Sequence, residues 1–224
     1  MSHSFYVGGQ RKSDAGGAFL TQEGEIRTIT NGLRQALNNP YFVELLKDSL
    51  AVAFEKSKAY RTDMPLTRYK KYRRRDTIRL LNWKEQMVDQ NIGGYTYKDG
   101  QLVVFVTLKK DEDFKGALMA YEDELLSPNL LKWYTKAPRT MSSPEVKAIL
   151  DYYISGLNMH IFVKKSDDEG TDFYYLGKVE PQLNSIEEFH KPTNDGKTKS
   201  VVEMHLKFLE AVDYKLYRYL TNIE

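Results

Sequence analysis

The segment of residues 92–110, IGGYTYKDGQLVVFVTLKK, constrains the fold more than any other part of the chain. Tyr95 and Tyr97 alternate with Thr96 before a KDG turn, and residues 102–108 form a β-rich apolar run after it. An Asp-Gly turn between two such runs predicts a β-hairpin with a buried second strand. Three more strands are predicted by the runs MHIFVKK, FYYLGKVE and SVVEMHLKFL, and the turn-rich SDDEGTD between the first two predicts a hairpin loop.

Apolar residues at helical spacing precede these strands. Over residues 30–59 they recur every three or four positions, and Pro40 divides the pattern into two helices. Two shorter helices are predicted, one over residues 73–87 with Asp76 as its N-cap and one over residues 142–156. Hairpin-linked strands with a few helices predict an α+β fold: a curved antiparallel sheet or barrel with peripheral helices, preceded by a helical segment.

The same patterns divide the chain into three segments. Residues 1–24 are rich in Gly, Ser and charge and show no periodicity, so we expect a flexible lead-in. Residues 25–66 form the helical segment, which ends at the breaker sequence TDMPL. Residues 67–224 hold the predicted sheet.

Composition excludes several classes of protein. A chain of 224 residues is long enough for one or two domains, and a net charge of +2 gives no global sign of nucleic-acid binding. The absence of cysteine excludes disulfides and thiolate metal sites, and it favours a reducing, cytoplasmic location. No apolar run approaches the roughly 20 residues of a membrane span, so we expect no membrane partner.

The sequence shows no recognisable catalytic motif. It has no phosphate-binding lysine loop, no GxGxxG, no GxSxG and no HExxH. The four histidines do not pair at ligand spacing, and His160 and His205 lie inside predicted strands, where a structural role is more common than a catalytic one. We therefore expect no cofactor, no bound metal and no enzymatic activity of this chain by itself.

Local basic clusters are a sharper signal. The run RYKKYRRR, residues 68–75, carries six cations and two tyrosines, which is typical of phosphate neutralisation combined with base stacking. A solvated linker at the domain junction is the alternative interpretation. The pairs Lys109–Lys110 and Lys164–Lys165 each follow a strand run, so the two strand ends could form one basic rim.

Several stretches in order resemble a known family: YKKYRRRDTIRLLNW, QNIGGYTY, YEDELLSP, LKWYTKAPRT, IFVKKSDDEGTDFYYLGKVEP and VVEMHLKFLEAVDYKLYRYLT. Residues 68–221 resemble a C-terminal domain of unknown function in bacterial superfamily II helicase-like proteins. There it follows a phospholipase D-type nuclease and an ATP-dependent translocase, and some of these proteins resemble Type IV restriction enzymes that cut DNA carrying 5-methylcytosine or 5-hydroxymethylcytosine. The domain is then similar to SRA domains of the PUA-like superfamily, which bind a flipped base.

The resemblance implies an SRA-like reader of modified cytosine in residues 67–224, coupled by residues 25–66 to helicase and nuclease domains. A flipped cytosine needs flat faces, an acceptor for its N4 amine, an apolar recess and cations for the backbone. Side-chain chemistry, and not the resemblance, selects the candidates. For the base pocket they are Tyr95, Tyr97, Tyr121, Glu122, Asp123, Trp133 and Tyr134. For the DNA backbone they are Arg68, Lys70, Lys71, Arg73, Arg74, Arg75, Lys109, Lys110, Lys132, Lys136 and Arg139.

Alternatives remain at two levels. Trp83, on an amphipathic helix, is expected in the core, whereas Trp133, flanked by Lys132 and Lys136 in a predicted loop, fits the pocket slightly better than the core. As a whole, the chain could also be a protein-interaction domain that couples parts of a helicase-like protein, or an RNA-binding PUA-like module.

Overall fold

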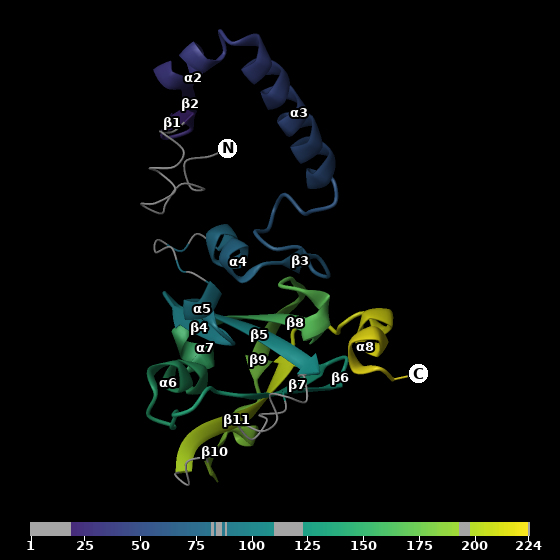
Figure 1. Ribbon diagram of the computed structural model, residues 1–224. Helices are drawn as coiled ribbons and strands as arrows, with labels where there is room; N and C mark the ends of the chain where they lie inside the picture. The colour runs from purple at the N-terminus through teal and green to yellow at the C-terminus, as the bar shows by residue number, and fades with distance from the viewer. Residues whose placement is uncertain are drawn as a thin grey trace. The chain divides into compact units, whose positions relative to one another are not determined.

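The computed structural model describes residues 19–81, 83, 87, 89–109, 123–192 and 198–223. The chain forms two compact units (Figure 1). The first comprises residues 1–67 and 75–88, and the second comprises residues 68–74 and 89–224. The predicted boundary lies beside the observed break after Thr67, but the sequence did not predict that residues 75–88 belong to the first unit.

The first unit contains the two predicted helices, α2 (Asn31–Ala36) and α3 (Pro40–Ser57). Side chains at their N-termini account for these starts: Thr30 Oγ1 accepts a hydrogen bond from the N–H of Leu33, and Asn39 Oδ1 accepts one from the N–H of Tyr41. A hairpin of β1 (Leu20–Glu23) and β2 (Ile26–Ile29) precedes them and was not predicted.

Helix α4 (Arg74–Leu80) corresponds to the predicted short helix, with one correction. Asp76 lies inside its first turn and is not its N-cap. Asp76 instead pairs with Arg79 one turn later, at 3.1 Å. Trp83, which follows this helix, is buried, as predicted.

The second unit is built on a nine-stranded sheet with the order β4-β5-β8-β9-β11-β7-β6, to which β10 adds on β11 and β3 on β9. The strands are β3 (Lys71–Tyr72), β4 (Tyr95–Lys98), β5 (Gln101–Lys109), β6 (Glu124–Ser127), β7 (Leu130–Tyr134), β8 (Asn158–Ser166), β9 (Phe173–Pro181), β10 (Glu187–Pro192) and β11 (Thr198–Phe208). Its helices are α5 (Asp89–Ile92), α6 (Pro144–Leu150), α7 (Tyr152–Ser155) and α8 (Tyr214–Thr221), with 3-10 turns η3 (Asp167–Glu169) and η4 (Leu183–Ser185). The predicted α+β class with a largely antiparallel sheet is confirmed.

The predicted hairpin is formed by β4 and β5. Asp99 and Gly100 both have positive φ, as a two-residue turn of type I′ requires, and Lys98 pairs with Gln101 across it. The three other predicted strands are present as β8, β9 and β11. The predicted helix over residues 142–156 is divided at Asp151 into α6 and α7.

One strand pair departs from the antiparallel pattern. Strands β5 and β8 run parallel, with Thr107 opposite Lys164 and Lys109 opposite Ser166. Parallel strands need a crossover connection, and here the chain between them includes β6, β7, α6 and α7. The ends of β5 and β8 that carry the lysines therefore lie side by side at the same end of the sheet, as the predicted basic rim requires.

The sheet is strongly curved. Tyr95 on the edge strand β4 and Trp133 on β7, near the opposite edge, pack ring to ring with centroids 5.1 Å apart. Both belong to one apolar core with side chains of β5, β8, β9 and β11, such as Val104, Ile161 and Met204. We call the line along which the two ends of the curved sheet meet, with β4 and β5 on one side and β6 and β7 on the other, the seam.

Candidate nucleic-acid interface

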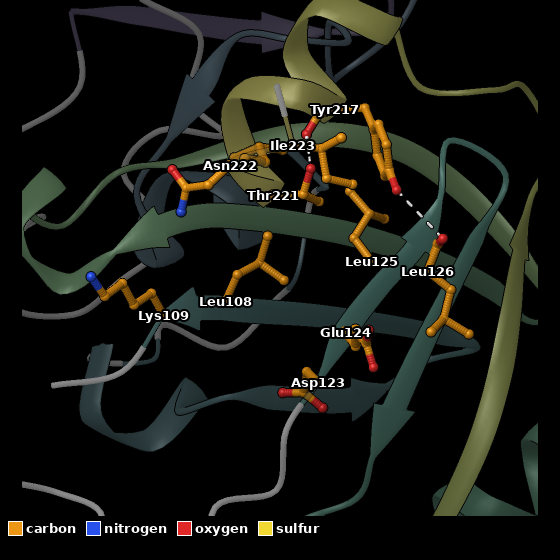
Figure 2. Close-up of a pocket in the computed structure, with 11 residues that line it drawn as sticks. Leu108, Lys109, Asp123, Glu124, Leu125, Leu126, Tyr217, Thr221, Asn222 and Ile223 are labelled. Carbon is orange, nitrogen blue, oxygen red and sulfur yellow. Dashed lines mark hydrogen bonds between the residues drawn. The ribbon is translucent and has the colours of Figure 1, made fainter. Parts of the chain in front are cut away.

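A pocket of about 420 Å³ opens at the seam, between the end of β5, the start of β6 and helix α8 (Figure 2). Small-molecule sites have volumes of about 300–1,000 Å³, so a ligand the size of a nucleobase fits this space. The lining comes from Leu108 and Lys109, residues 123–126, Tyr217 and residues 220–223.

Apolar and polar groups are separated within the pocket. Figure 2 shows Leu108, Leu125 and Ile223 near its centre. The carboxylates of Asp123 and Glu124 lie at one end, and the Asn222 amide lies at the other. A pocket of this kind can hold a flat ligand by its apolar faces and read polar groups on its edges.

The Asp123 and Glu124 carboxylates have different surroundings. Oδ1 of Asp123 accepts a hydrogen bond of 3.0 Å from the backbone N–H of Tyr134. Glu124 lies opposite Lys132 in the β6–β7 register and forms a 3.1 Å ion pair with it, although more than half of the Glu124 side chain is exposed. Lys132, predicted to hold phosphate, is thus partly neutralised within the sheet.

Helix α8 closes one side of the pocket and was missed in the sequence. The Asp213 side chain caps its N-terminus by accepting from the N–H groups of Lys215 and Leu216. Its buried face carries Tyr217, whose hydroxyl donates to the Leu126 carbonyl at 3.4 Å, and Leu220. An Asp N-cap followed by apolar residues at helical spacing is a signal that could have revealed this helix.

The basic rim beside the pocket is smaller than predicted. Lys109 is exposed at the end of β5, but Lys164 is buried and bonds Asp167 at 2.8 Å and the Gly170 carbonyl at 3.0 Å. Lys165 lies 4.8 Å from the centre of the Tyr219 ring. Lys110 lies outside the described residues, so among the described rim lysines Lys109 and Lys165 are the ones placed to reach a ligand.

A second group of predicted residues meets farther along the seam. The Tyr95 hydroxyl donates to Oε1 of Glu145 at 2.8 Å, and Arg139 Nε donates to the same oxygen. The Lys136 ammonium lies 4.7 Å from the centre of the Tyr95 ring. Glu145 is buried and was not singled out in the sequence, because a carboxylate in the first turn of a helix is common.

The basic run has a structural role that the sequence did not predict. Arg68 donates to the carbonyls of Leu176, Glu210 and Ala211 at 2.7–3.0 Å and pairs with the Glu210 carboxylate. Residues 71–72 join the sheet as β3. This segment is therefore neither a solvated linker nor an open strip of cations.

The other cations of the run are also engaged within the protein. Arg74 donates to the Gly93 carbonyl and covers the Phe173 ring, and its burial lowers the pKa of the guanidinium. Lys71 lies over Tyr174, and Arg73 pairs with Asp172 at 3.2 Å across the surface. Lys70 and Arg75 are half-buried.

The predicted aromatic faces are dispersed. Trp133 lies in the middle of β7 and is 2% exposed, so its placement in a loop is wrong and its ring belongs to the core. Tyr95 is also buried, Tyr134 is half-buried and Tyr97 is partly exposed on β4. Tyr121, Glu122 and Lys110 lie outside the described residues.

His160 and His205 lie in β8 and β11, as predicted. His160 Nδ1 lies 3.0 Å from the Tyr175 hydroxyl, and burial, assisted by the charge of Lys178, lowers its pKa to about 4. Within the described ranges, no three His, Asp or Glu side chains are grouped so that they could hold a metal ion. None of the described helices is long and apolar enough to cross a membrane.

Comparison with solved structures gives distant similarities. The DNA modification-dependent restriction endonuclease AspBHI is 16% identical with a TM-score of 0.38, over 59% of this chain and 38% of that one. KRYPTONITE in complex with mCHG DNA and SAH is 10% identical with a TM-score of 0.37, over 72% and 38% of the two chains. The sulfur-binding and SRA domains of ScoMcrA with phosphorothioated DNA are 9% identical with a TM-score of 0.37, over 69% and 45%.

The protein spans less than half the length of each of these solved chains. No curated protein sequence matches it. A family model does match residues 66–220, which include the whole nine-stranded sheet, the Tyr95–Glu145 contact and the pocket lining except Thr221, Asn222 and Ile223. Since this match covers more than half of the chain, the protein belongs to the family described as a domain of unknown function, DUF3427.

Proposed function

We propose that this chain binds duplex DNA and reads a modified cytosine, 5-methylcytosine or 5-hydroxymethylcytosine, which is flipped out of the helix into the seam pocket. The observation that carries the proposal is the pocket, in which an apolar centre and two carboxylates lie beside strand-end lysines. Each of these features corresponds to a need of a flipped cytosine: an apolar site for the ring, an acceptor for the amine and cations for the phosphates.

Asp123 is the proposed acceptor for the N4 amine of cytosine. Its carboxylate lines the pocket, and Oδ1 accepts a hydrogen bond from the Tyr134 N–H, which orients the group. Leu108 and Leu125 provide the apolar contact for a 5-methyl group. The Asn222 amide, which can donate and accept, lines the pocket away from Asp123 and would meet another polar edge of the base.

Lys109 and Lys165 are the proposed contacts to the backbone at the mouth of the pocket. They lie at the ends of adjacent parallel strands, where Lys109 is opposite Ser166, so the two lysines start from opposite faces of the sheet and would approach a DNA backbone from two sides. Phosphate contacts give affinity without sequence information, and the reading of the modification then depends on the pocket.

The proposal includes a wider role that follows from the sequence resemblance. The chain would be the target-recognition part of an ATP-dependent Type IV restriction enzyme, with helicase and nuclease domains as its partners. We expect it to neither cut DNA nor hydrolyse ATP by itself, with or without Mg²⁺. Metal-dependent nicking by the pure chain that disappears in Asp123→Ala would replace the reader proposal with a nuclease.

Fluorescence anisotropy with labelled oligonucleotides tests the reader proposal. Duplexes of one sequence with 5-methylcytosine, 5-hydroxymethylcytosine or cytosine at a single position are compared with the same sequence as RNA. The expected result is tighter binding of at least one modified duplex than of the unmodified duplex and the RNA. Equal affinity for all duplexes would overturn the proposal, and a preference for RNA would indicate a PUA-like RNA-binding module.

One observation favours a second function for the first unit. Helix α3 has no buried residue, and it exposes apolar side chains such as Tyr41 (87%), Leu45 (66%) and Phe54 (66%). A helix that is apolar on several faces is usually buried in a larger assembly, so coupling to another protein domain is a reasonable role. Leu45→Glu with Phe54→Glu should leave DNA affinity unchanged but abolish binding to that domain, measured with the helicase part of the same protein.

A further inference from the structure

Tyr95, Lys136, Arg139 and Glu145 form a compact charged group along the seam, which we call the clamp. Its centre is Oε1 of Glu145, which accepts from both the Tyr95 hydroxyl and Arg139 Nε. Arg139 also donates to the Pro138 carbonyl through Nη1, at 2.7 Å. With 30% of its side chain exposed, the guanidinium is held from the protein side and still reaches solvent.

The charges of the clamp are not balanced. Burial favours the neutral form of Glu145, but hydrogen bonds from its own backbone N–H, Arg139 and Tyr95 outweigh burial, so its pKa lies below the ordinary value. The hydrogen bond to Glu145 raises the pKa of Arg139, whereas burial and the charge of Arg139 lower the pKa of Lys136. Two cations thus stand close to one carboxylate, and an anion that binds both would relieve their repulsion.

The loop that carries the two cations is fixed to the sheet. The Thr135 N–H donates to the Val202 carbonyl, and the Val202 N–H donates back to Thr135 Oγ1. The Arg139 N–H donates to the Ser200 carbonyl at 2.9 Å. An ion-binding group on a loop that is already ordered loses little conformational entropy when a ligand arrives.

The clamp and the pocket lie along the same seam. Tyr95 of the clamp is opposite Val104 on β5, and Leu108 of the pocket is four residues farther along that strand, a rise of about 13 Å. This separation equals roughly four base-pair steps of 3.4 Å along duplex DNA. A nucleotide in the pocket would therefore place a phosphate about four base pairs farther along the same DNA near the clamp.

We propose that Lys136 and Arg139 bind one phosphate group together, and that Glu145 is the residue that positions Arg139 for this contact. The identification of that phosphate as part of DNA rests on the proposed function. The recognition chemistry itself, two cations fixed around an oxyanion, would also suit free phosphate or a nucleotide.

The test measures affinity for an unmodified duplex as a function of salt, so that reading of the modified base makes no contribution. Lys136→Gln and Arg139→Gln should each weaken binding and reduce the slope of log affinity against log salt by up to about 0.9, the value for one phosphate. Lys147→Gln, an exposed lysine on α6, is the matched control and should leave the slope unchanged. An unchanged slope in both clamp variants would overturn the proposal.

Glu145 is tested by comparing two substitutions with different chemistry. Glu145→Ala should reduce the salt slope as Arg139→Gln does, although it keeps both cations, because the guanidinium is no longer oriented. Glu145→Gln should restore part of the slope, since its amide oxygen can still accept from Arg139. A salt slope in Glu145→Ala equal to that of wild type would mean that Glu145 has a structural role only. The melting temperature of each variant is measured to check that the protein compared is folded. If Glu145→Ala does not fold, Glu145→Gln is tested alone. Its salt slope should then lie between the slopes of wild type and Arg139→Gln. A salt slope equal to that of wild type would show that Glu145 does not position Arg139.

Two further measurements separate this proposal from the reader proposal. Titration with inorganic phosphate and with a nucleoside monophosphate distinguishes a small-molecule site from a DNA contact: DNA binding predicts millimolar or weaker affinity for both. Tight binding of either would overturn the DNA assignment of the clamp. The affinity ratio of modified to unmodified duplex should be the same in Lys136→Gln as in wild type. If the clamp variants reduce the salt slope but neither wild type nor any variant prefers modified DNA, the clamp proposal is supported and the proposal that the chain reads modified cytosine is rejected.

Discussion

The backbone N–H of Tyr134, at the end of β7, donates a 3.0 Å hydrogen bond to Oδ1 of Asp123, which precedes β6. The backbone of a neighbouring strand therefore helps to set the orientation of this carboxylate. A donor that enters the pocket meets an acceptor whose position is already determined, which reduces the entropy that binding must overcome.

Asp123→Ala is expected to remove the preference for modified duplex DNA. A well-placed hydrogen-bonding group contributes about 1–3 kcal/mol to base discrimination, which is about 5- to 150-fold in affinity. Asp123→Asn keeps one oxygen acceptor, which the Tyr134 N–H and the cytosine amine would have to share, so its effect should lie between those of wild type and Asp123→Ala. Anisotropy titrations with modified and unmodified duplexes measure the ratio, and Glu187→Ala, an exposed carboxylate on β10, is the control. Equal losses on both duplexes would remove Asp123 from the base contact.

Arg68→Ala should lower the free energy of unfolding by about 1.5–3 kcal/mol, because the part-buried carbonyl of Leu176 loses its charged donor, whereas the exposed carbonyls of Glu210 and Ala211 can bind water instead. Arg68→Lys should not restore it, since an ammonium cannot reproduce the fork of a guanidinium. Urea unfolding measures the effect. Arg73→Ala in the same run is the control, and its exposed pair with Asp172 should contribute at most about 1 kcal/mol. If Arg68→Ala is as stable as Arg73→Ala, the structural role of Arg68 is refuted.

Local sequence signals predicted the parts of the fold that are formed locally. The KDG turn and its flanking runs became β4 and β5 because the turn type, the alternation and the apolar run all favour the same hairpin. The β6–β7 hairpin was missed, although Leu131 and Trp133 alternate with Lys132 in the manner of a half-buried strand. Charges and a proline around these short strands obscured the alternation.

Contacts between distant residues account for what the sequence could not show. Arg68 bonds residues that lie 108 to 143 positions away, so nothing near it in the sequence distinguishes it from the exposed cations of its run. The parallel pairing of β5 with β8 is also non-local, yet it brings the lysines at the ends of these two strands to the same end of the sheet. In the candidate site, Asp123 and Lys109 were predicted from chemistry, whereas Asn222 and Glu145 required the fold.

Acid should destabilise the protein through His160. Its pKa of about 4 in the folded state is below the unfolded value of about 6.5, so the unfolded chain binds the proton first. The stability due to neutral His160 is complete above pH 6.5 and is lost as the pH falls toward 4, by up to about 3 kcal/mol. Urea unfolding at several pH values should show a flatter profile for His160→Gln, and His205→Gln on β11 is the control. Identical profiles for wild type and His160→Gln would contradict this.

Trp133→Ala should lower the free energy of unfolding by about 3–5 kcal/mol and leave the affinity ratio of modified to unmodified duplex unchanged. The ring is 2% exposed and packs edge-on against Tyr95 across the curved sheet, so its removal leaves a cavity between the two edges. Trp133→Phe keeps an aromatic ring in the core and should recover most of the lost stability. Urea unfolding and anisotropy on the same preparations measure both quantities, at a temperature where each variant is folded. The opposite pattern, normal stability with a lost preference for modified DNA, would show that the indole contacts the flipped base and would return Trp133 to the pocket.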